Sequence, residues 1–294
     1  MKDLRTATIE FEDLGNMKNL VQTYETIAAN TMLRIRSSVL QNRAFHRGLE
    51  RIFEDLRRAY QKEVMDLMKK KRVKSREGES LSVIRKNGKT VFVLLAANTG
   101  LYGDIIAHVF SFFAAEYRRE PVDTIVVGKT GKAFFDETFS GAPYTYFDFP
   151  DNGIDIETLK DITRRLTPYE KVIVFYGTFK NFLLQQATFS SVSGENLSSD
   201  GLLYKQMKYI FEPELEKILV FFETEIFSSL LEQVFHESRL AKLSSRMVLL
   251  ESASVNIEKR TKKIFLERGE LRHRMMNKKQ LNAIAGILLL GRTV

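Results

Sequence analysis

The sequence predicts an α/β domain set between two long helices that pair antiparallel as a coiled coil. Apolar residues recur in steps of three and four at both ends of the chain, and no proline interrupts residues 4–71 or follows Pro213. Between them, short apolar runs alternate with helical stretches, which is typical of a Rossmann-like sheet. We expect a coiled-coil helix in 1–75, a central α/β domain in 76–209 and a second coiled-coil helix in 210–294 that pairs with the first.

The N-terminal helix is predicted from Leu4 to about Lys71. Its apolar spacing has a mean period of about 3.5 residues, the period of a helix that buries a narrow seam against a partner. A helix of about 60 residues reaches about 90 Å at 1.5 Å per residue, longer than a compact domain requires. The predicted seam residues are Leu14, Met17, Val21, Tyr24, Ala28, Thr31, Ile35, Ser38, Asn42, Phe45, Leu49, Ile52, Leu56 and Ala59.

The C-terminal helix follows the same rule. Pro213 stands where the first turn of a helix accepts proline. The alternative to a coiled coil is two separate amphipathic helices, each packed on the middle domain. The predicted seam residues are Leu240, Leu243, Met247, Leu250, Ser254, Ile257, Thr261, Ile264, Arg268, Leu271 and Met275.

The middle of the chain is expected to form a parallel-type α/β sheet. Short apolar runs predict buried strands, an extended segment and a further strand at a sheet edge, with helices between them. The expected strands are 91–97, 124–127, 144–149, 171–176 and 185–192, and the expected helices begin at Ile105, at Lys132 and at Ile156.

Two glycine-bearing turns after strands are the candidates for nucleotide binding. Residues 128–130 read Gly-Lys-Thr, like the end of a phosphate-binding loop, but that pattern requires an earlier glycine where Asp123 stands. Gly100 and Gly103 are better explained by a tight strand-to-helix turn than by a dinucleotide site. We therefore expect no cofactor.

Catalytic and metal-binding constellations are not found in the sequence. The chain has no cysteine and four histidines, none of them four residues from another. Acidic pairs such as Asp136 and Glu137 fit a solvated surface better than a catalytic site. The N-terminus lacks the apolar stretch of a signal peptide, and residues 284–290 are far shorter than the roughly 20 residues of a membrane span. A cytoplasmic, non-catalytic protein is expected.

Basic residues gather toward the ends of both predicted helices. The net charge of +8 fits either an acidic partner surface or simple solubility. Favourable charge near a helix C-terminus is the alternative explanation, and nucleic acid is not expected because the basic face lacks stacking aromatics. The basic residues are Lys69, Lys70, Lys71, Arg72, Lys74 and Arg76 after the first seam, and Lys259, Arg260, Lys262, Lys263, Arg268, Arg272, Arg274, Lys278 and Lys279 in the last helix.

Several segments together carry a family resemblance. Residues 245–256, Ser-Arg-Met-Val-Leu-Leu-Glu-Ser-Ala-Ser-Val-Asn, are similar to the pattern Arg-Met-x-Ala-Met-x-x-Ala-Thr-x-Asn of the gamma subunit of F-type ATP synthase. Shorter matches in the same order lie at 2–5, 27–32, 99–103, 127–135 and 212–213. Over essentially its whole length the chain resembles that family.

The resemblance implies a central rotor shaft that carries torque and performs no catalysis. Its partners would be three catalytic and three non-catalytic subunits of a hexameric ATPase head, a small epsilon-type subunit and the rotor ring of the membrane. It would act at the cytoplasmic face of the inner membrane, as part of the complex. The basic face, Lys259, Arg260, Lys262, Lys263 and Arg268, would meet acidic lever loops of the head.

The resemblance also implies two contact regions on the shaft. A bearing tip would comprise Leu281, Ile284, Ile287, Leu288, Leu289 and Leu290. A catch toward the head would comprise Arg272, His273, Asn277 and Gln22. His273 stands where the family has glutamine, and Gln22 where a lysine is usual. These departures leave open a gamma-like subunit of a paralogous rotary ATPase with a non-synthase role, and the residues alone leave open a free-standing α/β binding module with helical arms.

Overall fold

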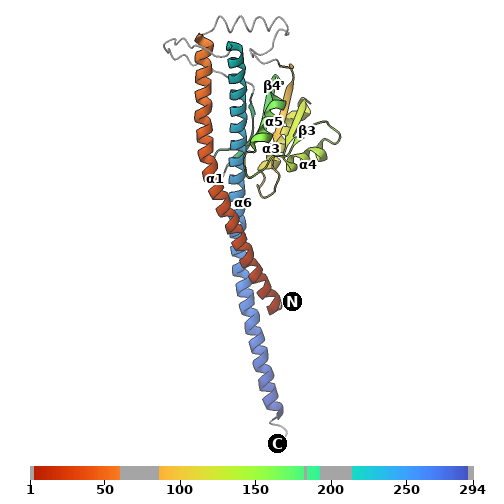
Figure 1. The fold of residues 1–294 in the computed structure, drawn as a ribbon. Helices are drawn as coiled ribbons and strands as arrows, with labels where there is room; N and C mark the ends of the chain where they lie inside the picture. Colours follow the sequence, from red (N-terminus) through yellow and green to blue (C-terminus); the bar gives the residue numbers. More distant parts are fainter. Residues whose placement is uncertain (1–2, 60–85, 182–183, 193–213, 291–294) are drawn as a thin grey trace. The chain divides into compact units, whose positions relative to one another are not determined.

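The computed structural model describes residues 3–59, 86–181, 184–192 and 214–290. The chain forms two compact units, one of residues 1–29 and 247–294, the other of residues 30–246. Two long helices, α1 (Leu4–Ala59) and α6 (Leu215–Leu290), contribute a segment to each unit (Figure 1). The predicted domain boundaries, the predicted last turns of the first helix and the basic cluster at 69–76 all lie outside the described residues. Within the described part, no helix is both long and apolar enough to cross a membrane.

In the first unit, α1 and α6 pair antiparallel. Val21 is buried with Leu250 and Ile257, and Leu14 packs against the same cluster. Lys18 Nζ lies 2.8 Å from Glu258 Oε1, and Arg260 Nη2 lies 2.5 Å from Glu10 Oε1. Residues with lower numbers in α1 contact residues with higher numbers in α6, as antiparallel helices do. The coiled-coil pairing expected from the sequence is therefore confirmed here.

The second unit contains its own stretch of the helix pair. Phe53 and Leu56 of α1 are buried with Leu219 and Ile226 of α6. The Phe53 ring also lies 6.1 Å from the ring of Phe222, centroid to centroid. Apolar contacts of this kind, and not helix propensity, account for most of the stability of such helices.

Part of the predicted seam of α1 is wrong by one residue. The predicted heptad positions Val21, Ala28, Ile35 and Leu56 are buried, but four of the alternate positions face solvent. Those exposed residues are Met17 (55%), Tyr24 (41%), Phe45 (53%) and Ile52 (52%). The residues one position after the predicted Thr31, Ser38, Phe45 and Ile52 are buried instead, namely Met32, Val39, His46 and Phe53. From Ala28 onward α1 therefore steps by four and then three, where the prediction stepped by three and then four.

The predicted seam of α6 is largely confirmed. Leu243, Leu250, Ile257 and Ile264 are all buried, and the predicted residues between them are half-buried. Only Met275, the last predicted position, is exposed. The α6 pattern was easier to predict because charged residues occupy most of its outer positions.

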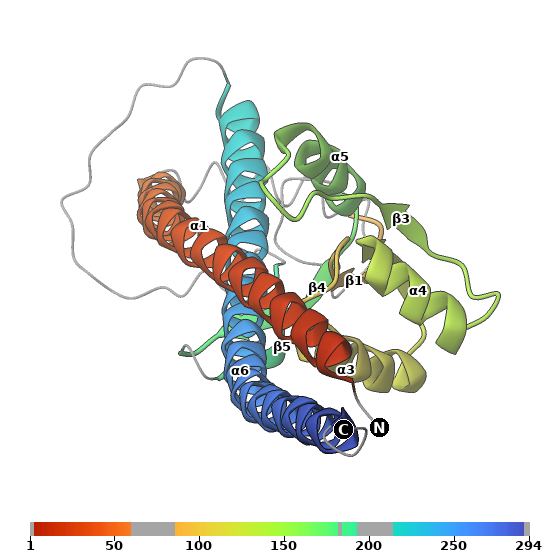
Figure 2. The same cartoon turned by 90° about the horizontal axis from the view of Figure 1, so that it is seen from below.

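The α/β domain of the second unit is a five-stranded sheet in the order β3-β2-β1-β4-β5. The strands are β1 (Thr90–Leu95), β2 (Asp123–Val127), β3 (Thr145–Phe147), β4 (Lys171–Phe179) and β5 (Gln185–Ser191). Strands β1 to β4 run parallel to one another, and β5 pairs antiparallel with β4. β3 and β5 form the two borders (Figure 2). The expected Rossmann-like α/β class and the edge position of the last strand are confirmed.

Helices cover both faces of this sheet. α3 (Ile105–Arg119) and α4 (Lys129–Thr138) bury one face, in a core that contains Phe92, Phe113 and Phe135. α5 (Ile156–Leu166) and α6 bury the other, with Val93 and Leu231 in its core. Neighbouring strand residues such as Phe92 and Val93 enter opposite cores because successive side chains alternate across a sheet. The sheet is therefore covered on both faces, as parallel sheets are.

Candidate functional site

The site that fold geometry singles out is the end of the sheet where β1 meets β4. β1 leads through α3 to β2 on one side, while β4 lies on its other side. In open α/β sheets, ligands bind outside the carboxyl ends of the strands at such a topological switch point. What fills this position therefore decides whether the domain can hold a nucleotide.

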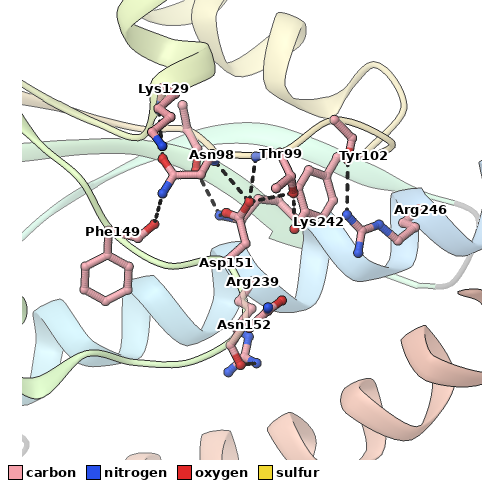
Figure 3. A network of polar contacts seen from close by, with 12 residues as sticks. Asn98, Thr99, Tyr102, Lys129, Phe149, Asp151, Asn152, Arg239, Lys242 and Arg246 are labelled. Carbon is pink, nitrogen blue, oxygen red and sulfur yellow. Dashed lines mark hydrogen bonds and ion pairs between the residues drawn. The ribbon is translucent and has the colours of Figure 1, made fainter.

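Asp151 is the centre of a polar network at this position (Figure 3). Its Oδ2 accepts hydrogen bonds from the backbone N–H groups of Asn98 and Thr99, at 3.0 and 2.8 Å, and from Thr99 Oγ1 at 2.8 Å. Only 5% of the Asp151 side chain is exposed. These donors hold the turn after β1 against the segment that follows β3.

The counter-ion of Asp151 comes from α6. Lys242 Nζ lies 3.6 Å from Asp151 Oδ1 and donates a hydrogen bond to Ala96 O at 2.9 Å. The Lys242 side chain is 12% exposed, and this burial lowers its pKa, an effect that the Asp151 carboxylate partly offsets. A charge so placed is costly unless it stays paired, so Lys242 and Asp151 tie α6 to the sheet.

Further along α6, two side chains bind the backbone of the same turn. Arg246 Nε and Nη2 donate to Leu101 O and Gly100 O at 3.2 and 3.1 Å, and the guanidinium carbon lies 4.1 Å from the centre of the Tyr102 ring. Ser245 Oγ donates to Tyr102 O at 2.6 Å. Burial raises the pKa of the Tyr102 phenol. One turn of α6 thus satisfies three successive carbonyls of the turn after β1.

Side chains of α3 and α6 approach the backbone closely at two glycines near this end of the sheet. A Cβ on Gly103, which has φ +57°, would lie 2.7 Å from Ser245 Oγ. A Cβ on Gly177 of β4 would lie 2.8 Å from Ile105 Cγ1 and 3.4 Å from Ala241 Cβ. The expectation that Gly103 permits a tight turn is confirmed, and α6 occupies the switch point.

The start of α4, which contains the Gly-Lys-Thr stretch, is also closed to phosphate. Gly128 has φ +97°, and a Cβ there would lie 2.8 Å from the backbone of Ala97. The N–H of Lys129 donates to Asn98 Oδ1 and that of Thr130 to Ala97 O, both at 2.9 Å. A phosphate-binding helix N-terminus needs such N–H groups free. Here the N–H groups of Lys129 and Thr130 already have acceptors within the chain.

The residues predicted to form a catch toward the head do not lie together. Arg272 and His273 line a groove of about 630 Å³ between α6 and the first turns of α1, together with Leu4, Thr8 and Arg268 among others. Gln22 lies eighteen residues along α1 from Leu4, about 27 Å at 1.5 Å per residue. Asn277 is exposed beyond the groove. Two of the four residues therefore share a surface, and their role in contacting a partner stays a prediction.

The predicted basic face is divided between internal contacts and solvent. Arg260 pairs with Glu10, and the guanidinium of Arg268 lies 4.3 Å from the centre of the Phe11 ring. Lys259, Lys262 and Lys263 are exposed on α6. These three lysines are the part of the face that is directed to solvent in the described chain.

The predicted bearing tip is the end of α6. Leu281, Ile284 and Ile287 are 66, 54 and 70% exposed, whereas the side chains of Leu288, Leu289 and Leu290 lie outside the described ones. Exposed apolar residues at a helix end are expected where a partner covers them. The tip stays a prediction that its exposure supports.

Sequence reasoning missed the Asp151 network. Asp151 lies in a turn after Pro150, and Lys242 lies on α6 among other charged residues, so neither stands out in the sequence. The available signal was the stretch at 239, 242 and 246, where three cations at helical spacing fall on the face that also carries the seam residue Leu243. Charges next to a buried stripe indicate a buried carboxylate partner.

Comparisons with known proteins agree with this geometry. A family model described as ATP synthase matches residues 4–286. The ATP synthase gamma chain of Chloroherpeton thalassium is 22% identical over 311 residues and that of Dichelobacter nodosus 18% over 298; each alignment covers 97% of this chain and at least 97% of the relative.

Solved structures show the same fold at low sequence identity. The rotor of the Euglena gracilis mitochondrial ATP synthase contains a chain with a TM-score of 0.56 and 15% identity, over 92% of this chain and 99% of that one. A chain of the central stalk and c-ring structure from Tetrahymena thermophila gives 0.52 and 18%, over 80% and 99%. At such identities these structures speak for the fold alone.

The fold and the site define a class of protein: a subunit in which two long helices pair and an α/β domain has its ligand crevice filled by one of them. The chain belongs to the ATP synthase family. The resemblance to the gamma subunit drawn from the sequence is confirmed, and with it the expected role of a gamma chain, the central shaft of an F-type ATP synthase.

Proposed function

We propose that the chain carries torque between a hexameric ATPase head and the membrane rotor ring without catalysing a reaction itself. The observation that carries this proposal is the antiparallel pairing of α1 with α6 in both units, with α6 also closing the crevice of the α/β domain. In the first unit, residues 247–290 of α6 would span about 66 Å at 1.5 Å per residue. Such an element suits a shaft and is longer than a compact domain requires.

The absence of catalysis is supported by what occupies the candidate ligand positions. Lys242, Ser245 and Arg246 fill the switch point, and the first N–H groups of α4 are bound. A shaft acts instead by presenting different surfaces to the subunits around it. Each orientation favours one conformation at each catalytic site, so rotation shifts the populations of those conformations.

The partners follow from the same proposal. Three catalytic and three non-catalytic subunits would surround the first unit, at the cytoplasmic face of the inner membrane, and an epsilon-type subunit and the rotor ring would bind elsewhere. The exposed lysines at 259, 262 and 263 would meet acidic lever loops of the head, and Arg272, His273, Asn277 and Gln22 would take part in contacts with it. Their solvent exposure supports these roles, because a partner can reach them.

Co-purification from native cells tests the proposal. A tag on this chain is expected to recover two ATPase-fold subunits, with three copies of each per copy of this chain. Purified chain alone is expected neither to bind nor to hydrolyse ATP with saturable affinity. Recovery of the chain without any ATPase subunit, or clear nucleotide turnover by the isolated chain, contradicts the shaft.

The tip offers a test within the assembled complex. Replacement of Leu281, Ile284 and Ile287 by serine is expected to leave the melting temperature of the isolated chain unchanged, because all three side chains are exposed. Coupling of ATP hydrolysis to ion pumping is expected to fall several-fold, because an apolar bearing loses its contacts. Serine at Leu249 and Val255, which are also exposed on α6 and do not line the groove of Arg272 and His273, is the control for surface apolarity as such. Unchanged coupling in the tip variant argues against the bearing.

A further inference from the structure

Among the described residues, the border strand β5 has a backbone edge without a partner strand. β5 lies at one end of the sheet, and β4 is its one neighbour in that part of the chain (Figure 2). Val192 N–H donates to Val172 O at 2.9 Å, and the register continues from Ile173 opposite Ser191 to Gly177 opposite Ala187. Because hydrogen-bonded residues alternate along an antiparallel ladder, the N–H and C=O groups of Ala187 and Phe189 are directed away from β4.

The outward N–H groups of Ala187 and Phe189 donate to no acceptor among the described residues. The outward C=O of Phe189 accepts one long hydrogen bond, 3.5 Å, from Thr188 Oγ1 of the same strand. No residue of β5 is buried, whereas β1, β2 and β4 are largely buried. An open edge of this kind is a template for one more strand.

β5 also lacks the devices that protect sheet edges. Its sequence, Gln-Gln-Ala-Thr-Phe-Ser-Ser, contains no charge and no proline, the residues that usually prevent edge-to-edge pairing. At seven residues it is more than twice the length of the other border strand, β3, which has three. The exposed edge is therefore long enough and neutral enough to accept a strand of several residues.

The side chains define what the added strand must carry. The Phe189 ring is 52% exposed and lies 5.9 Å from the ring of Phe112 and 6.0 Å from that of Phe175, on the face of the sheet that packs on α3. Gln186, Thr188 and Ser190 point to the opposite face. A strand that alternates an apolar residue beside Phe189 with polar residues on the other face fits both sides.

We propose that β5 is an interaction surface that takes an extended segment of a different subunit by strand addition. The segment supplies the main-chain groups that pair with Ala187 and Phe189, and an apolar side chain that covers the Phe189 ring. The assignment of the strand to a different subunit rests on the proposed function, because a rotor has one shaft and a second copy of this chain has no place in it.

Amide hydrogen exchange, measured residue by residue, tests the proposal on the full chain alone and in the complex from native cells. In the isolated chain, Thr188 and Ser190 are expected to exchange slowly, because they bond to β4, while Ala187 and Phe189 exchange fast. In the complex, exchange at Ala187 and Phe189 is expected to slow at least about ten-fold. Fast exchange in the complex overturns the proposal; slow exchange already in the isolated chain shows that this chain covers its own edge and overturns it too.

A variant separates strand addition from general burial. Ala187→Pro removes an outward N–H without touching the β4 ladder and places the proline ring in the path of an added strand. Ala187→Thr keeps the N–H and is the matched control. In complexes that contain Ala187→Pro, Phe189 is expected to exchange as fast as in the isolated chain, while Ala187→Thr behaves as the original chain.

A photo-reactive residue at the exposed Gln186 identifies the neighbour. A cross-link in the complex is expected to join this position to a short segment of a different subunit, and a cross-link to a second copy of this chain or to its own residues overturns the proposal. If the chain is absent from any ATPase complex, the proposed function fails. If the chain is present but its β5 edge is unprotected, only strand addition fails.

Discussion

The exchange of Asp151 for asparagine is expected to destabilise the second unit by about 3 kcal/mol. The Asp151 and Lys242 side chains are 5 and 12% exposed, and removal of one partner from a buried ion pair costs about 3–5 kcal/mol because the other charge stays buried. The lower end of that range applies, since the asparagine oxygen can still accept the hydrogen bonds from Asn98 and Thr99. Urea unfolding at about pH 7, followed by tyrosine fluorescence, measures the loss.

The deficit of the Asp151→Asn variant is expected to shrink as the pH rises. Burial lowers the pKa of Lys242, and loss of the nearby carboxylate charge lowers it further. Between that folded pKa and the unfolded value of 10.5, the unfolded chain binds the proton more tightly, so stability from this group increases with pH. Once Lys242 is neutral in both proteins, the ionic attraction no longer distinguishes them.

The double variant Asp151→Asn with Lys242→Met is the control. Because it removes both charges together, it is expected to be more stable than Asp151→Asn alone by about 1–3 kcal/mol. An Asp151→Asn loss below about 0.5 kcal/mol, or a double variant no more stable than the single one, would falsify the view that this pair fastens α6 to the sheet.

Three further outcomes follow from particular residues. Phe53→Ala is expected to cost about 3–5 kcal/mol in chemical unfolding and Ile52→Ala less than about 0.5, since Phe53 is 2% exposed and Ile52 52%; equal losses contradict the observed seam of α1. Gly128→Ala is expected to cost at least about 1–3 kcal/mol, because φ is +97° and the new Cβ would meet backbone at 2.8 Å; a change within about 0.5 kcal/mol argues against this turn. A hydrogen bond to Asp136 raises the pKa of the Tyr144 phenol to about 12, so ultraviolet titration is expected to contain a tyrosine that ionises near pH 12 and that Asp136→Asn returns toward 10; titration unaffected by Asp136→Asn contradicts the bond.

Helical and strand periodicity predicted most of the fold. The helix at 156–166 and the edge strand near 185–192 were predicted with nearly the observed bounds, because their patterns are unambiguous. The phase of α1 was not, since Met17 and Tyr24 are apolar yet face solvent, while the half-buried Lys18 pairs with Glu258 in α6. A single helix read by itself does not say which of two adjacent apolar rows meets the partner.

The candidate site was predictable only in part. The glycine turn at 103 and the closed start of α4 were expected from the residues themselves. The bond of Lys242 to Asp151 joins positions 91 residues apart, and no local pattern relates them. The residues of the predicted catch were likewise assigned individually by resemblance to the family. Of the four, the structure brings only Arg272 and His273 to one groove. Contacts between residues far apart in the sequence can be identified only once the fold is known. The sequence pattern predicts the helices and strands but not how their side chains meet.

The central claim is that this chain turns inside an ATPase head. The chain contains no cysteine, so Glu137→Cys on the exposed side of α4 provides one attachment point for a gold rod. With the head of the assembled complex fixed to a surface, addition of ATP is expected to turn the rod in one direction, in steps of a third of a turn. A rod that stays fixed while the same complexes hydrolyse ATP contradicts the shaft.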